Sequence, residues 1–440
     1  MLIKGFFAIL TLCRFYYVLR TCLDKSRQYA IRATFLSLLL LPCTLPLAAQ
    51  ETVVHEVLPG DTWLALSIRY QLPIETLQNE NPHMNSQRQP TIGSMIQIPA
   101  TGQEEVTSKI LRPYSQSLFS TAMRTNQTVW GLAMRNGIAS PYVPLLYRAL
   151  IIPDDTAVPR EFPVGVDVLE VSQTIAQPGQ AIGVRGLVEE NVAFTAVLDG
   201  NETDLFTDGN HLVALTGMGA FFGSGQPELT IQAGNGPLWS QPWQFQDKDD
   251  WIVQNLNLTG DAAKIDQESI DKERARLMEI WHTDTAVPQW QGNFIEPIGD
   301  YLQISAPYGA RRSYNGGPVR TYHEGVDYSA YGGTAVFAPA KGTVIIAEEL
   351  YVRGGAVIID HGMGIYTGFY HMSSVGVDVG DVVTQGQLIG EVGTTGLSTG
   401  NHLHWDLLVN GIWVDAQAFR DQSMPCWILE GIGSQCLPEN

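Results

Sequence analysis

A group of histidines near the C-terminus constrains this chain more than any other feature. Five of its nine histidines fall between residues 323 and 404. His323 and Asp327 lie four residues apart, and His402 and His404 flank a single leucine. Catalytic zinc sites use three such nitrogen and oxygen ligands and keep one position open. The two motifs together therefore predict the metal site of a zinc hydrolase.

The backbone expected around the second motif explains its spacing. Residues 403–409 are mostly bulky and apolar and contain no breaker, which predicts a strand. Side chains at positions i and i+2 of a strand share one face, about 7 Å apart. His402 and His404 should therefore point into the same space. In the first motif, Gly325 is expected to bend the backbone so that the two flanking ligands converge.

Further short motifs surround these histidines. In order, they are Tyr308-Gly309-Ala310-Arg311-Arg312, His323-x3-Asp327, Ala338-Pro339-Ala340-x-Gly342-x-Val344, Ile359-Asp360-His361-Gly362, Val379-Gly380-Asp381-x-Val383, Gly386-Gln387-x-Ile389-Gly390 and Thr395-Gly396-x-Ser398-Thr399-Gly400-x-His402-Leu403-His404. With them, residues 305–419 resemble the M23 (lysostaphin-type) zinc metallopeptidases. The resemblance implies an all-β domain of antiparallel sheets.

The resemblance also implies roles for five residues. His323, Asp327 and His404 would hold Zn²⁺, and His371 and His402 would be catalytic histidines that do not bind the metal. One departure concerns the residues around the first catalytic histidine.

The M23 family usually has Tyr-x-His-Leu at that place, whereas this chain has Phe369-Tyr370-His371-Met372. Any role of the family's tyrosine hydroxyl would pass to Tyr370 or be absent. Glu324 is an alternative general base of the kind used by helical zinc peptidases, but the resemblance gives that position no role. His361 is flanked by Asp and Gly, which is typical of a hairpin turn, so a structural role is expected for it.

Two other β-rich families share parts of this pattern. Residues 380–387 alone resemble a biotinyl or lipoyl carrier, which needs a lysine for covalent attachment, and no lysine follows Arg353. Cupins also carry His-x-His, but they expect a glutamate a few residues downstream, and residues 405–410 contain none. Both alternatives are therefore disfavoured.

The N-terminal residues have the pattern of a secretory signal. Basic residues between 25 and 32 precede the apolar run 33–47, and small residues follow up to Ala49. The run is shorter than the roughly 20 residues needed to span a bilayer. Residues 1–49 are thus expected to be cleaved, with a retained N-terminus that associates with a membrane as the alternative.

Charge and cysteine content fit an exported protein. Residues 1–49 hold six Lys/Arg and one Asp, so their removal takes the net charge from −19 to −24. Such an acidic chain is not expected to bind nucleic acid. The cysteines that remain, Cys426 and Cys436, are expected to form a disulfide, with two free thiols as the alternative.

Residues 50–102 are expected to form a small βααβ module. The pattern predicts strands at 53–57 and 95–98 and helices at 63–70 and 74–79, with Asp61 as the cap of the first helix. This order, with Pro59-Gly60-Asp61-Thr62, resembles a LysM domain, which implies binding of N-acetylglucosamine-containing glycans. A packing module without glycan affinity is the alternative.

The rest of the chain is divided by changes in composition. An amphipathic helix is expected within 261–281. The expected order is a degenerate LysM-like segment (103–160), a β-sandwich-like domain (161–248), a helical linker (249–300), the M23 domain (301–420) and a C-terminal tail (421–440).

These expectations describe a secreted zinc metalloendopeptidase of the cell envelope, either periplasmic or extracellular. It would hydrolyse the peptide cross-links of peptidoglycan, with the glycan strands bound by LysM and the stem peptides by the peptidase domain. The alternative is a non-enzymatic regulator that activates partner amidases. Such regulators have lost metal ligands, whereas all five site residues are present here, which favours the enzyme.

Overall fold

The computed structural model describes residues 52–84, 89–100, 106–198, 201–203, 205–223, 225–257, 265–281 and 285–437. The expected signal, residues 1–49, lies outside these ranges. Within them, no helix is both long and apolar enough to cross a membrane.

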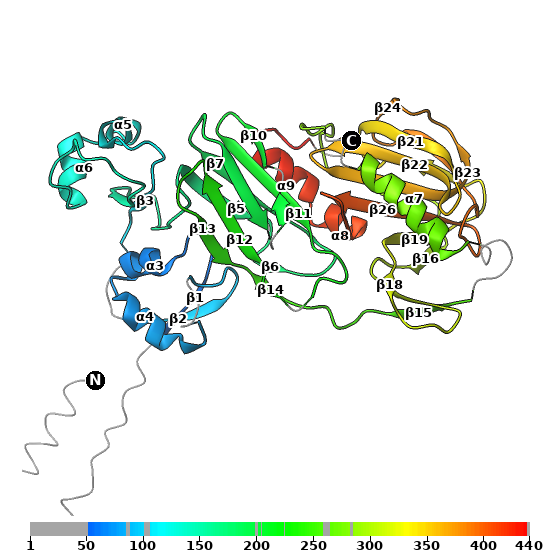
Figure 1. Ribbon diagram of the computed structural model, residues 1–440, viewed down its shortest axis with the longest axis horizontal. Coiled ribbons are helices and arrows are strands. Elements are labelled where there is room, and N and C mark those ends of the chain that lie inside the picture. Colours follow the sequence, from blue (N-terminus) through cyan, green and yellow to red (C-terminus); the bar gives the residue numbers. More distant parts are fainter. Residues whose placement is uncertain are drawn as a thin grey trace, which may run out of the picture. The chain divides into compact units, whose positions relative to one another are not determined.

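Two small βααβ modules come first, drawn in blue and cyan in Figure 1. In each, two helices lie between two antiparallel strands in the sequence, and those strands pair with each other. The first module consists of β1 (Thr52–Glu56), α3 (Trp63–Tyr70), α4 (Ile74–Glu80), η2 (Pro82–Met84) and β2 (Met95–Pro99). The second consists of β3 (Lys109–Leu111), α5 (Leu118–Arg124), α6 (Val129–Arg135) and β4 (Leu150–Ile152).

The predicted helix 63–70 is confirmed as α3, but its capping residue differs from the prediction by one position. Thr62, not Asp61, is the N-cap, and its hydroxyl accepts a hydrogen bond from the Ala65 N–H at 3.1 Å. The Asp61 carboxylate instead accepts from the Leu58 N–H and bonds His55, both at 2.9 Å. Both side chains are acceptors suited to a helix start, so the sequence alone did not separate them.

The predicted β-sandwich is confirmed. Its two four-stranded sheets run in the orders β10-β11-β7-β5 and β13-β12-β8-β9, and they share a core that includes Leu169 and Val184 from one sheet and Ala196 and Ile231 from the other. The strands of the two sheets are β5 (Val166–Val171), β7 (Ala181–Val188), β8 (Phe194–Leu198), β9 (Asn201–Thr203), β10 (Leu205–Asp208), β11 (His211–Gly217), β12 (Glu228–Ala233) and β13 (Trp239–Pro242). Two short strands, β6 (Ile175–Ala176) and β14 (Gln244–Phe245), pair in parallel as a separate two-stranded sheet.

A ten-stranded sheet with the path β16-β19-β26-β23-β22-β21-β24 forms the C-terminal domain. The predicted strand at 403–409 is confirmed as β26. Every residue of β22 is buried, which explains the continuous apolar run Ala356-Val357-Ile358-Ile359. The strands are β16 (Gln303–Ala306), β19 (Gly325–Ser329), β20 (Ala335–Phe337), β21 (Gly342–Leu350), β22 (Gly354–Gly362), β23 (Ile365–Val375), β24 (Val382–Val383), β25 (Leu388–Val392), β26 (His402–Val409) and β27 (Ile412–Val414).

Segments upstream of residue 301 pack on this domain. The predicted amphipathic helix is present as α7 (Gln267–Ile280), and its Leu277 lies in the core of the large sheet. β15 (Val253–Leu256) pairs in parallel with β17 (Arg311–Tyr314), which also pairs with β18 (Thr321–Tyr322). The stretch expected to be a linker thus supplies a strand and a helix to the C-terminal domain.

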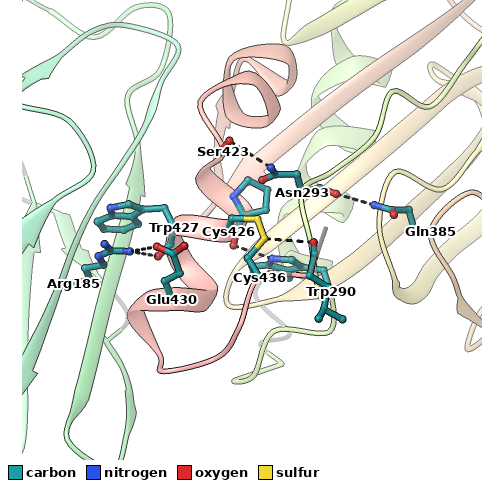
Figure 2. The surroundings of a disulfide bond; sticks show 11 residues. Arg185, Trp290, Asn293, Gln385, Ser423, Cys426, Trp427, Glu430 and Cys436 are labelled. Atoms are coloured by element: carbon teal, nitrogen blue, oxygen red, sulfur yellow. Dashed lines mark hydrogen bonds and ion pairs between the residues drawn. A yellow bond between two sulfur atoms is a disulfide. The ribbon is translucent and has the colours of Figure 1, made fainter. Parts of the chain in front are cut away.

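Two helices close the chain, α8 (Ala416–Asp421) and α9 (Met424–Gly431). The predicted disulfide is present between Cys426 of α9 and Cys436 (Figure 2). Arg185 of the sandwich lies 5.0 Å over the ring of Trp427 and donates to the Glu430 carboxylate at 3.1 Å. α9 therefore contacts the sandwich directly.

Candidate active site

Adjacent strands bring the predicted metal ligands together. β19 and β26 are antiparallel, and their register places Asp327 directly opposite His404. Gly325 is the first residue of β19, and His323 lies just before that strand. A Cβ at Gly325 would lie 2.3 Å from the Trp405 carbonyl oxygen and 2.8 Å from His404 Nε2. Glycine is required here because the two strands approach closely.

Three potential ligand atoms converge at this point. His323 Nε2 lies 2.9 Å from His404 Nδ1, and Asp327 Oδ1 lies 2.9 Å from the former and 2.8 Å from the latter. The set combines two imidazole nitrogens with one carboxylate oxygen, which is a donor set that zinc accepts. We call these three residues the triad.

The surroundings of the triad fit a divalent cation. His323 Nδ1 lies 3.0 Å from the Pro307 carbonyl oxygen. Because a carbonyl only accepts, Nδ1 must carry the proton, and Nε2 presents its lone pair to the triad. Burial lowers the pKa of the His404 imidazole to about 3, against the opposing effect of Asp327. Burial raises the pKa of Asp327, but His323 and His404 together hold it well below its usual range.

The two predicted catalytic histidines lie beside the triad. His371 Nδ1 donates to the Thr395 carbonyl at 2.8 Å, and His402 Nδ1 donates to the Gly400 carbonyl at 2.8 Å. Their ring centroids are 4.7 Å apart, and His402 Nε2 lies 3.8 Å from Asp327 Oδ1. Both rings therefore keep Nε2 free of the main chain. The structure thus brings all five predicted site residues together.

The backbone of His371 is unusual. Its φ of 63° lies in the left-handed region, which non-glycine residues rarely occupy. Its N–H donates to the Arg353 carbonyl at 2.9 Å. Burial lowers the pKa of His371 well below its usual range, and the nearby His402 and His404 contribute to the same shift. Strained residues of this kind cluster at functional sites.

The Tyr370 side chain is buried and does not line the open side of the site. It is 1% exposed, and its ring centroid lies 5.5 Å from that of His404. The Arg353 guanidinium lies 5.1 Å from the Tyr370 ring centroid. The Tyr370 side chain therefore packs behind the triad. Glu324 pairs with Arg274 at 2.7 Å, so its carboxylate is already engaged.

The site opens into a groove of about 260 Å³. Its lining includes His371, His402 and His404, together with Gln254 of β15 and Arg312 of β17. Arg312 Nη2 lies 3.3 Å from Asp327 Oδ2. Among the described residues, the buried Gln254 Oε1 and Arg312 Nε have no hydrogen-bond partner. Sequence reasoning missed both as site residues, since Arg312 stood out only within a motif and Gln254 carried no signal.

Comparison with known families agrees with this geometry. The model of peptidase family M23 matches residues 321–416, and the LysM domain model matches residues 55–99. The chain carries an M23 peptidase domain and a LysM domain. The predicted resemblances are therefore confirmed for these two segments. The M23 match includes all five candidate site residues, while Gln254 and Arg312 lie upstream of it.

Curated relatives match the M23 domain. DD-carboxypeptidase/endopeptidase Mpg of Neisseria meningitidis is 40% identical over 132 residues, which make up 29% of this chain and 29% of the relative. Peptidoglycan DD-endopeptidase ShyA of Vibrio cholerae is 34% identical over 120 residues, or 27% of this chain and 28% of the relative. The chain thus spans less than a third of the length of either relative.

Among solved structures, the catalytic domain of lysostaphin from Staphylococcus simulans is similar. It is 31% identical and has a TM-score of 0.22, with 29% of this chain and 90% of that chain covered.

Proposed function

We propose that this protein is a secreted zinc endopeptidase that hydrolyses the peptide cross-links of peptidoglycan. The observation that carries the proposal is the convergence of His323 Nε2, Asp327 Oδ1 and His404 Nδ1 beside a groove lined by His371 and His402. The substrate class is supported by the relatives of the M23 domain, because Mpg and ShyA are named as endopeptidases and ShyA as a peptidoglycan enzyme.

The triad would hold the zinc ion. When bound, zinc polarises a scissile carbonyl and lowers the pKa of water towards about 7. His371 and His402 serve the proton transfers, because each donates Nδ1–H to a main-chain carbonyl and keeps Nε2 available. One Nε2 takes the proton of the attacking water, and a protonated imidazole stabilises the negative oxygen of the tetrahedral intermediate.

Two groove atoms without a hydrogen-bond partner within the described ranges, Gln254 Oε1 and Arg312 Nε, would bind the peptide. Gln254 Oε1 is a buried acceptor that nothing among the described residues satisfies, and a peptide N–H supplies the missing donor. Buried polar groups are rarely left unpaired, so an incoming substrate is the natural partner. Arg312 Nη2 donates to the Asp327 carboxylate, and Arg312 Nε remains available to donate to a substrate carbonyl.

The LysM domain would keep the enzyme on its substrate. LysM binding of glycan strands raises the local concentration of stem peptides around the groove. Neither the triad nor the two catalytic histidines belong to the LysM match, residues 55–99, so binding and cleavage should be separable.

The test uses the chain from residue 50 onward and purified peptidoglycan sacculi. The protein should release soluble fragments, and a chelator should stop the release until zinc is restored. Mass spectrometry should find new amino groups at peptide bonds. New sugar reducing ends would instead indicate a glycan-cleaving enzyme of the kind that uses paired carboxylates.

Two further outcomes would refute the proposal. Zinc-loaded protein that cuts neither sacculi nor soluble cross-linked peptides is not an endopeptidase. If the same protein accelerates a separate amidase, the regulatory function replaces the enzymatic one. The matched control is Glu324→Gln, which removes the charge of the alternative general base and should leave turnover largely unchanged, because Glu324 is already paired with Arg274.

A further inference from the structure

The two βααβ modules share one structural feature, an asparagine at the end of the second helix that hydrogen-bonds the last strand. Asn81, at the end of α4, donates to a helix carbonyl and to the Gln97 carbonyl, and accepts from the Gln97 N–H, each at 2.8 Å. Asn136, at the end of α6, makes the same three bonds at 2.7–3.1 Å, with Ile151 in the place of Gln97. The two modules therefore share a frame, against which their surfaces can be compared.

The outward face of the second module is strongly apolar. On α5, Phe119 and Met123 are 60% and 70% exposed, and on α6 Trp130 and Met134 are 57% and 78% exposed. Each pair has i, i+4 spacing, so its members lie on one helix face. The opposite faces of α5 and α6 pack inside the module, where the buried residues are Leu118, Thr121, Ala122, Leu132 and Ala133. In the loop before β4, Tyr142 and Leu146 are 88% and 76% exposed.

The same module is basic in an acidic protein. Residues 106–153 contain five Lys/Arg and no Asp or Glu, although the chain has 45 acidic residues in all. Arg135 follows Met134 directly, and Arg148 lies two residues after Leu146. Neither arginine has a carboxylate partner within the part of the chain that the structure describes. Both are exposed. Arg148 Nη2 donates to the Asn136 carbonyl at 2.8 Å, and the other N–H groups of its guanidinium remain to bind an anion.

This combination matches one class of partner better than others. Helices that lie in a membrane interface present Trp, Phe and Leu beside Lys and Arg. Sugars are bound by flat aromatic faces with polar groups, whereas Met123, Met134 and Leu146 are aliphatic chains without hydrogen-bonding atoms suited to hydroxyls. Large apolar side chains exposed together on two neighbouring helices mark an interaction site, and the positive charge of the module is complementary to anionic headgroups.

We propose that this face of the second module, formed by α5, α6 and the loop 142–148, docks on a membrane surface rich in anionic phospholipid. The apolar side chains enter the headgroup region, and Arg135 and Arg148 contact phosphate groups. The proposal does not depend on peptidase activity.

The test is vesicle flotation of the chain from residue 50 onward, which lacks the apolar N-terminal segment. Vesicles of phosphatidylglycerol mixed with phosphatidylcholine should bind the protein, and pure phosphatidylcholine should bind it far less. Arg135→Gln with Arg148→Gln should lower the binding constant roughly 30-fold, since each charge near such a surface contributes about fivefold. Met134→Ser with Trp130→Ser should lower it at least tenfold.

Met95→Ser is the matched control, because Met95 is 58% exposed on β2 of the first module. It should leave vesicle binding unchanged. The proposal is overturned if the wild type ignores anionic vesicles or if Met95→Ser weakens binding as much as the α6 variant. If the α6 variant binds vesicles normally but loses binding to sacculi, the face recognises glycan instead. Circular dichroism of each variant checks that the fold is retained.

Discussion

Main-chain carbonyls set the proton positions of three histidines of the candidate site. His323, His371 and His402 each direct Nδ1 at a carbonyl oxygen. A carbonyl fixes the tautomer without adding charge, so Asp327 supplies the negative charge of the triad. The arrangement presents lone pairs on Nε2 of all three rings. Substitution of each ring should therefore reveal what its Nε2 does.

The first prediction separates metal binding from turnover. His323→Ala, Asp327→Ala and His404→Ala should each lose zinc and activity, because each removes one ligand of three. His371→Ala and His402→Ala should keep zinc and lose about 10²–10⁴-fold in turnover, the usual effect of a proton-transfer group. Metal analysis and peptide cleavage of the same preparations provide both readouts. Loss of zinc in His402→Ala with retention in His404→Ala would reverse the roles within the His-x-His motif.

A second prediction concerns His361, which is fully buried away from the triad. Its Nδ1 donates to the Lys341 carbonyl and its Nε2 accepts from the Thr367 hydroxyl, and burial lowers its pKa to about 4. The unfolded chain, with an imidazole pKa of about 6.5, binds the proton more readily. Stability should therefore fall as pH drops from about 6.5 to about 4, by about 3 kcal/mol from this group.

Urea unfolding at several pH values should show this dependence, and His361→Gln should flatten it. NMR titration of His361 in the wild type provides a second measurement that does not require the variant to fold. An imidazole that titrates near 6.5 in the folded protein would refute the prediction. The structural role expected of His361 from its position is consistent with these contacts, although it lies at the end of β22 and the turn follows it.

Elements with a local signature were predicted well. The helix 63–70 and the strand that carries His404 follow from apolar spacing over a few residues. β15 was missed because its parallel pairing with β17 joins segments far apart in the sequence, and such pairing leaves no local pattern. Gln254 gains its importance from that pairing alone. The same holds for Gly325, whose need for space depends on Trp405 of the neighbouring strand.

A third prediction tests β15. Gln254→Ala should raise KM for a soluble peptide substrate about 2- to 10-fold with little change in kcat, because one neutral hydrogen bond to the bound peptide is lost. Asn255→Ala is the matched control, since neighbouring strand residues point to opposite faces and Asn255 is exposed. A fall in kcat at constant KM, or an equal effect of both substitutions, would contradict a binding role for Gln254.

At the scale of the whole molecule, the LysM domain and the sandwich are joined by buried contacts. Ile92, in the LysM match, forms a parallel bridge with Trp243 and lies in the sandwich core. Gly60 N–H donates to the Gln241 side chain at 3.0 Å. The sequence alone suggested two separate modules, because contacts between residues far apart in the chain leave no pattern in its composition. Deletion of the LysM domain would expose this core, so competition is the better test of glycan binding.

The fourth prediction is therefore made for the intact chain from residue 50 onward. Soluble N-acetylglucosamine oligomers should displace the protein from sacculi, while cleavage of a small soluble peptide should continue unchanged. Glucose oligomers of equal length, which lack the acetamido group, serve as the control and should not compete. If neither sugar competes, or if both do so equally, the module is a packing unit without specific glycan affinity.

The position of β15 has a consequence for gene fusion. The M23 match begins at residue 321, yet a strand from 253–256 contributes a wall of the groove. A breakpoint near residue 301 would transfer every metal ligand to a new host while leaving that wall behind. A breakpoint upstream of Val253 would transfer the wall as well. Chimeras made at these two places should thus differ in which peptides they accept, even though they inherit the same catalytic centre.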